Sequence, residues 1–247
     1  MPSPFALLAR SWKTYWSHLF TVLKLVLLPM ILSLLLVAIL AAILVATGLL
    51  QAANLGPFQL AMLIPAILAA IIFALIFSLL GRTSLLAFLD RSDAYPGLLP
   101  LYRQVWPILG KFLLTQALVG IFILGGLLLL IIPGLILTVR YIFVPFIVIS
   151  EGKSGKQALA QSSSYVKGKF WGVLGRSLFI GIISLLLSGT ATQVNNTIIV
   201  SIIQLMMALG VAPLTTIYFY HLYQECKLGG SDSLPLSFSR PAPAPIS

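Results

Sequence analysis

The side chains that could carry out acid–base or nucleophilic chemistry are few in this sequence. The 247 residues include five Asp and Glu, two His and one Cys. Hydrolytic sites need paired carboxylates, a metal cluster, or a Ser or Cys beside a His. The two histidines, His18 and His221, are far apart in the chain, and the single Cys226 excludes an internal disulfide and cannot complete a zinc site. The sequence therefore predicts a non-enzymatic protein without a metal or other cofactor.

One charged residue lies inside an apolar run. Arg140 precedes Ser150, the expected end of a helix, by ten residues, which places it about 15 Å from that end. An Arg near the bilayer centre costs at least about 2.5–3.5 kcal/mol and normally faces the bundle interior or a wet cavity. Pro145 leaves the Tyr141 carbonyl without its usual donor, which makes that carbonyl a candidate partner. Two interpretations stay open: Arg140 fixes packing by binding carbonyls or glutamines, or it binds an anionic substrate or lipid phosphate.

Three other features near this run have simpler interpretations. Glu151 is expected to pair with Lys153 or with a helix N-terminus, and it has no catalytic partner in the sequence. Arg176, five residues after Trp171, is expected to snorkel to the membrane interface. A tyrosine-rich group near the C-terminus is expected to form an interfacial aromatic belt: Tyr218, Tyr220, His221 and Tyr223.

The elements that position these residues follow from composition. The chain is 60% hydrophobic and 8% charged, with a mean hydropathy of +1.08, whereas about a quarter of the residues in soluble domains are charged. Asp, Glu, Lys and Arg are absent between Lys24 and Arg82, from Gln116 to Val139, and from Ser177 to Gln224. A membrane-spanning helix needs about 20 apolar residues. We therefore predict an all-α polytopic integral membrane protein whose six transmembrane helices form three hairpins.

The expected spans cover residues 25–48, 58–80, 113–131, 135–150, 170–188 and 197–220. Pro133-Gly134 is expected to form the tight turn between the third and fourth spans. Between the fourth and fifth spans, Ser154 and Gln157 resemble a capping box that opens a short helix. Residues 1–226 thus form one membrane domain, and the Gly-, Ser- and Pro-rich tail 227–247 is expected to be disordered.

Aromatic and basic residues mix at the borders of the spans. Segments 4–20 and 98–112 have the composition of helices that lie in the membrane interface. The hexapeptides WPILGK (106–111) and WGVLGR (171–176) match in pattern, which indicates either an internal repeat or convergence of anchors on Trp plus a cation. The expected interfacial anchors are Trp12, Trp16, Trp106, Lys111, Trp171 and Arg176.

The distribution of basic residues predicts sidedness. Lys and Arg lie before span one, between spans two and three, between spans four and five, and after span six, whereas the other connectors have none. By the positive-inside rule, both termini and the interfacial helices are expected on the cytoplasmic side. The Lys and Arg residues that give the chain its net charge of +10 flank apolar spans. We therefore expect anionic lipid headgroups as partners rather than nucleic acid.

Residues 131–176 contain a series of spaced motifs: Pro133-Gly134, Arg140, Glu151-Gly152, Ala158-Leu159, Ser162, Lys167-Gly168 and Trp171. In this pattern they resemble a large bacterial family of six-helix membrane proteins. The family is related to the membrane domain of glycerophosphoryl diester phosphodiesterase and to the uncharacterised YciC-like inner-membrane proteins. The resemblance implies a bacterial cytoplasmic (inner) membrane location. The phosphodiesterase barrel and its metal residues are absent from this sequence, so enzymatic activity is not implied.

Together these features predict a non-enzymatic, multi-pass protein of the bacterial inner membrane that acts in membrane or envelope homeostasis and contacts lipid headgroups. The alternative is a small transporter or lipid-translocating protein with a path near Arg140. A polar cavity that surrounds Arg140 and reaches one membrane face would favour this alternative.

Overall fold

The computed structural model describes residues 2–46, 57–90, 97–189 and 197–228. All of the secondary structure within these ranges is helical, which confirms the predicted fold class. The elements are α1 (Pro4–Ser17), α2 (Leu19–Ala46), α3 (Pro57–Asp90), α4 (Leu98–Leu129), α5 (Ile131–Arg140), α6 (Val144–Ser150), α7 (Gly155–Val166), α8 (Phe170–Gly189), α9 (Thr197–Met206), the π-helix η3 (Met207–Val211) and α10 (Ala212–Lys227).

Six segments of the described chain are long and apolar enough to cross a membrane. They are Leu19–Val45, Leu63–Asp90, Leu98–Leu129, Ile131–Ser150, Phe170–Leu187 and Ile199–Lys227. Their number and order match the predicted spans, and several extend beyond the predicted limits. The predicted connectors at 49–57 and 188–196 and the tail after residue 228 fall almost entirely outside the described residues.

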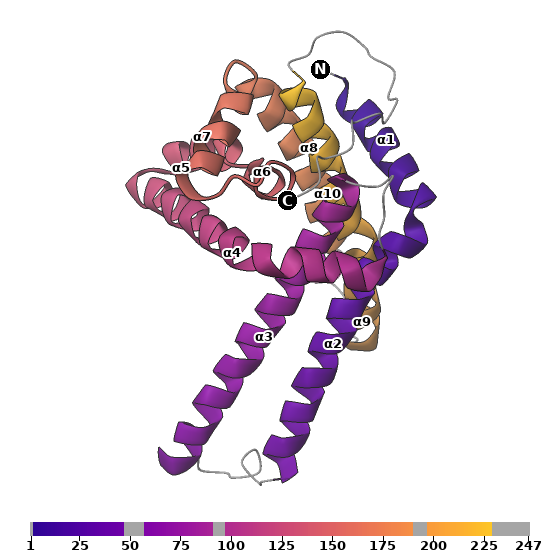
Figure 1. Ribbon diagram of the computed structural model, residues 1–247, viewed down its shortest axis with the longest axis vertical. Coiled ribbons are helices and arrows are strands. Elements are labelled where there is room, and N and C mark those ends of the chain that lie inside the picture. The colour runs from indigo at the N-terminus through magenta and orange to yellow at the C-terminus, as the bar shows by residue number, and fades with distance from the viewer. Residues whose placement is uncertain (1, 47–56, 91–96, 190–196, 229–247) are drawn as a thin grey trace, which may run out of the picture.

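The buried core lies at one end of the molecule. In α2 the buried residues, including Val22 and Leu25, belong to its first part, and the buried residues of α3 lie between Leu80 and Leu89, in its last part. These two helices pack as an antiparallel hairpin, so both buried parts lie at the same end. Figure 1 shows the rest of this hairpin extending away from the other helices, while α4 crosses it near the core. The short helices α1, α6 and α7 and the long α10 also contribute to the core.

The predicted interfacial segment 98–112 is not a separate helix. It is the first half of α4, which continues to Leu129. The buried residues Leu101, Val105, Phe112 and Thr115 recur at helical spacing through this junction, so one helix buries them on a single face.

The turn between the third and fourth spans is at Leu130 and not at Pro133-Gly134 as expected. Leu130 is extended, with φ −166° and ψ 148°, between the end of α4 and the start of α5. Pro133 lies in the first turn of α5, where its missing N–H has no helical acceptor to lose. Gly134 lies against α4: a Cβ there would be 2.9 Å from the Leu127 backbone nitrogen. Gly134, which has no side chain, therefore allows α5 to approach α4 closely.

The fourth span is interrupted in its middle. Helix α5 ends at Arg140, three turn residues follow, and α6 begins at Val144. Ser162 of α7 bridges this break: its hydroxyl donates to the Arg140 carbonyl at 2.7 Å and accepts from the Phe143 N–H at 3.3 Å. A buried side chain from another helix thus satisfies backbone groups that an unbroken helix would pair internally.

Helix α7 buries one face, with Ala158, Leu159, Ser162 and Val166 inside. Its start differs from the predicted capping box, because Ser154 is the N-cap residue but makes no side-chain capping bond. The Gly155 N–H instead donates to the Thr115 hydroxyl of α4 at 2.9 Å.

Candidate functional site

The carboxylate of Glu151 joins three helices at the edge of the core. The apolar helix α6 ends at Ser150, and Glu151 is its C-cap residue. The next residue, Gly152, has φ +68°, in the region that glycine adopts at little cost. This turn leads the chain toward α7, and α10 packs against both α7 and the core.

Two tyrosines and two lysines surround the Glu151 carboxylate, and we refer to these five residues as the Glu151 cluster. The hydroxyls of Tyr165 (α7) and Tyr223 (α10) donate to Oε1 at 2.7 and 2.8 Å. Lys227 Nζ lies 3.2 Å from Oε1, and Lys153 Nζ lies 3.1 Å from Oε2. The Glu151 side chain is only 11% exposed. The predicted pairing with Lys153 is thus present, and three further partners accompany it.

These surroundings change the proton affinity of the carboxyl group. Burial raises the pKa of Glu151, but hydrogen bonds from Tyr165 and Tyr223 and the neighbouring ammonium groups oppose this and lower it to about 2. Burial and the carboxylate raise the pKa of Tyr165, so its hydroxyl remains a donor. Glu151 is therefore a permanent anion at neutral pH, suited to holding cations rather than to donating a proton.

Aromatic rings cover the Glu151 cluster on its core side. The Tyr223 ring stacks on Phe146 with centroids 5.6 Å apart, and it lies 6.0 Å from both Phe143 and Tyr165. The predicted interfacial belt is therefore wrong for the tyrosines: Tyr218 and Tyr223 are fully buried and Tyr220 is 9% exposed. His221 binds Thr14 of α1 through Nε2 at 3.2 Å. These residues face α1, α6 and α7. Helices of the protein therefore cover this part of α10, where the sequence predicts the membrane interface.

Arg140 is exposed at the C-terminal end of α5, a position that favours a cation. Among the described residues its guanidinium has no hydrogen-bond or ion-pair partner. Pro145 lies in the first turn of α6, and the Tyr141 carbonyl that it leaves free accepts from the Val144 N–H at 3.1 Å. The expected distance of about 15 Å between Arg140 and the end of the fourth span at Ser150 holds only for one straight helix. The span breaks after Arg140, so this distance does not apply.

The four tryptophans expected as anchors are each more than half exposed: Trp12, Trp16, Trp106 and Trp171. Trp12 and Trp16 stack in parallel on α1, with centroids 5.8 Å apart. Lys111 is also exposed. The two similar hexapeptides occupy different places, since WPILGK lies inside α4 whereas WGVLGR starts one residue into α8.

Arg176, expected to snorkel, bonds to backbone carbonyls of the protein, one on its own helix and one near the N-terminus. Its guanidinium donates to the Gly172 carbonyl at 2.8 Å and, through Nε, to the Pro2 carbonyl at 3.1 Å. The side chain thus connects α8 to the residues before α1.

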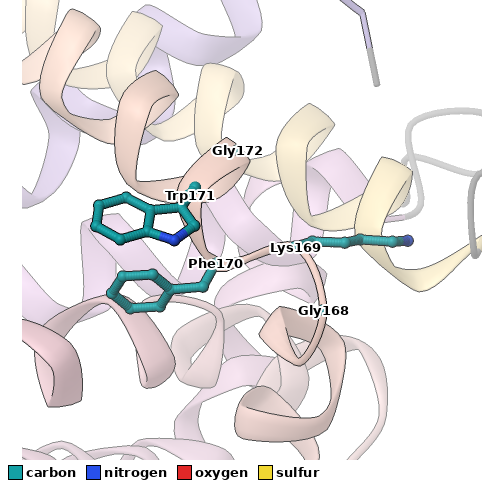
Figure 2. Close-up of a pocket in the computed structure, with 5 residues that line it drawn as sticks. All are labelled: Gly168, Lys169, Phe170, Trp171 and Gly172. Atoms are coloured by element: carbon teal, nitrogen blue, oxygen red, sulfur yellow. The ribbon is translucent and has the colours of Figure 1, made fainter.

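Two shallow hollows lie beside exposed tryptophans. One, of about 410 Å³, is lined by residues 168–172, and the other, of about 550 Å³, by residues 16–21. Figure 2 shows the rings of Phe170 and Trp171 beside each other while Lys169 extends in another direction. Arg140 lines neither hollow.

Within the described ranges, no group of three or more His, Cys, Asp and Glu side chains is placed to hold a metal ion. Four polar residues that bond between helices are not predicted from the sequence: Ser162, Thr115, Tyr15 and Tyr102. The available signal was a polar residue on the apolar face of an amphipathic helix, as Ser11 and Tyr15 are on α1.

Comparisons with protein-family models, curated proteins and solved structures found no match to this chain. The family suggested by residues 131–176 remains a prediction.

Proposed function

We propose that this chain is a non-enzymatic integral protein of the bacterial inner membrane whose exposed aromatic and basic surface binds anionic lipid headgroups. In this proposal it acts in membrane or envelope homeostasis, with both termini in the cytoplasm. The observation that carries the lipid-binding role is the division of α1 into two faces. Leu7, Ser11 and Tyr15 are buried, whereas Trp12 and Trp16 are stacked and exposed.

This division is what a helix at the membrane interface requires. Tryptophan concentrates at the headgroup level, where its ring is apolar and its N–H meets a polar surrounding. Lys13, between the two tryptophans, is also exposed. A Lys near an anionic bilayer surface contributes about 1 kcal/mol of attraction.

The non-enzymatic part of the proposal has separate support. Glu151, the most enclosed acidic side chain for which an ion pair is described, is held by two lysines and two tyrosines and has a pKa of about 2. A general acid or base works best with a pKa near the operating pH. We do not propose the transporter alternative, because the observation on Arg140, an exposed side chain at the end of α5, gives it no specific support.

Lipid-dependent stability tests the proposal. Purified protein in detergent is heated with added phosphatidylglycerol or phosphatidylcholine, and the melting temperature is followed for the wild type, Lys13→Gln and Trp12→Ala/Trp16→Ala. We expect phosphatidylglycerol to stabilise the wild type more than phosphatidylcholine does, and each variant to lose about half of that difference.

The matched control is Leu34→Ala on α2, an exposed apolar residue far from the buried end of that helix. It should keep the full preference for phosphatidylglycerol. Equal stabilisation of the wild type by both lipids would contradict the proposal.

A further inference from the structure

Two prolines interrupt the hydrogen bonding of two membrane spans, and a tyrosine from a neighbouring helix compensates at each. Pro213 lies at the start of α10 and Pro29 lies inside α2. A proline has no N–H, so the carbonyl four residues earlier loses its usual donor. Those carbonyls belong to Leu209 and Leu25.

The Leu209 carbonyl accepts a hydrogen bond from the Tyr15 hydroxyl of α1 at 3.0 Å. Leu209 lies in η3, the π-helical turn that separates α9 from α10. Such turns widen the backbone and permit a bend. The sixth span therefore has a proline and a π-turn at the same place. The Tyr15 hydroxyl of α1 supplies a donor to the carbonyl that is left without one there.

The Leu25 carbonyl accepts a hydrogen bond from the Tyr102 hydroxyl of α4 at 3.1 Å. Pro29 is buried, and a Cβ added to Gly81 of α3 would lie 3.4 Å from its ring and 3.7 Å from the Leu25 oxygen. Gly81 thus packs directly beside the proline and the carbonyl that Tyr102 reaches. The arrangement at α2 repeats the one at α10 with different helices.

Further contacts align α1 along the sixth span. Arg10 forms an ion pair with Glu225 at 3.2 Å, and Thr14 binds His221 at 3.2 Å. Together with the Tyr15 bond, they show that α1 lies antiparallel to α10. The Tyr15 bond lies where η3 meets α10. Because α1 also carries the exposed Trp12 and Trp16, one helix has an outward aromatic face and an inward contact to the hinge.

We propose that the hydroxyls of Tyr15 and Tyr102 act as clasps at proline hinges, the places where Pro213 and Pro29 interrupt two membrane spans. Each clasp supplies the hydrogen-bond donor that the proline lacks and so fixes the local bend. The docking of α1 thereby sets the bend of the sixth span. A free carbonyl in a membrane protein must find a donor within the protein. The tyrosines supply this donor from helices that lie at the buried end of the molecule. Opening the Tyr15 clasp would free η3 to change its angle without unfolding α9 or α10.

Double-mutant cycles test each clasp. Tyr15→Phe removes only the hydroxyl, and Pro213→Ala restores the N–H that can reach the Leu209 carbonyl. We expect Tyr15→Phe to lower the melting temperature by about 2–4 °C, and by less than half as much in the Pro213→Ala background. Tyr102→Phe should show the same dependence on Pro29→Ala.

The crossed pairs are the matched controls. Tyr15→Phe with Pro29→Ala, and Tyr102→Phe with Pro213→Ala, should be additive, because these partners share no carbonyl. Equal effects of Tyr15→Phe with and without Pro213 would overturn the proposal, as would the same coupling in matched and crossed pairs.

Spin-label distances keep the proposal testable if a proline variant does not fold. Labels at Met206→Cys and Leu228→Cys, in a Cys226→Ser background, span the hinge with both prolines intact. We expect Tyr15→Phe to broaden or shift the distance distribution and Tyr102→Phe to leave it unchanged. An unchanged distribution in Tyr15→Phe would contradict a clasp at η3.

Discussion

At the scale of single residues, the buried end of the molecule depends on polar side chains that bond across helices. Glu151 connects α6 to α7 and α10 through Tyr165, Tyr223 and Lys227, and it also pairs with Lys153 of the connector after α6. Ser162 pairs the backbone on both sides of the break in the fourth span. Without these partners the Glu151 carboxylate and the Ser162 hydroxyl would be enclosed polar groups with no hydrogen bond, so these two residues specify how the short helices pack.

Glu151 predicts how stability depends on acid. Its pKa falls from an ordinary 4.5 to about 2 on folding, so the carboxylate stabilises the fold fully above about pH 4.5. This contribution, on the order of 3 kcal/mol, is lost as the pH falls from 4.5 toward 2. Glu151→Gln should lower the melting temperature at pH 7 and flatten its decline between these pH values.

Melting temperatures of the wild type and Glu151→Gln, measured from pH 7 to pH 2, check this expectation. The matched control is Glu225→Gln, whose ion pair with Arg10 is far more exposed and should contribute less. Parallel pH profiles for wild type and Glu151→Gln would show that the Glu151 cluster does not control acid stability.

At the scale of helices, close approach depends on a few of the glycines. A Cβ at Gly126 would lie 3.0 Å from the Gly134 Cα, and one at Gly134 would meet the Leu127 backbone, whereas Gly120 and Gly125 face open space. The glycines of α4 therefore coincide with close helix packing only near the turn of the α4–α5 hairpin.

Gly134→Ala should strongly destabilise the protein, because the added Cβ meets backbone and two carbons of Leu127 at 2.6 Å. Overpacking of this kind costs about 1–3 kcal/mol. Gly125→Ala, in the facing helix, should be neutral or slightly stabilising through its helix propensity. Thermal unfolding in detergent compares the two, and equal effects would mean that the helices are farther apart than described.

At the scale of the whole molecule, the core lies at the end of the α2–α3 hairpin where the chain enters α2 and leaves α3. The rest of that hairpin exposes large apolar residues such as Leu34, Leu35 and Leu75. In water such a surface would be unfavourable, whereas lipid can cover it. The molecule is thus stabilised by protein contacts at one end and requires an apolar surrounding along the spans.

Cysteine labelling of cells tests sidedness. In a Cys226→Ser background, cysteines at Ala160 and Asp93 should resist a membrane-impermeant reagent, while those at Ala52 and Val194 should react. The reason is that Lys and Arg are confined to one set of connectors. Permeabilised cells, in which all four should react, are the control. Labelling at residue 160 in intact cells would overturn the predicted orientation.

The sequence by itself determined the class of the protein and the order of its six apolar segments. Both follow from local composition, because a run of apolar residues long enough to span a bilayer needs no distant partner to be recognised. The burial of one face of α7 and the exposure of the four tryptophans were predictable for the same reason. The partner of Glu151 two residues away was also predictable.

Tertiary structure alone decided where the chain turns, where a span breaks and which tyrosines are buried. The turn at Leu130 depends on the fit of Gly134 against α4, and the break after Arg140 depends on Ser162, 22 positions along the chain. Tyr15 and Leu209 are separated by 194 positions. Each feature rests on a hydrogen bond or close contact between helices, and the periodicity of a single helix contains no information about the atoms of its neighbour.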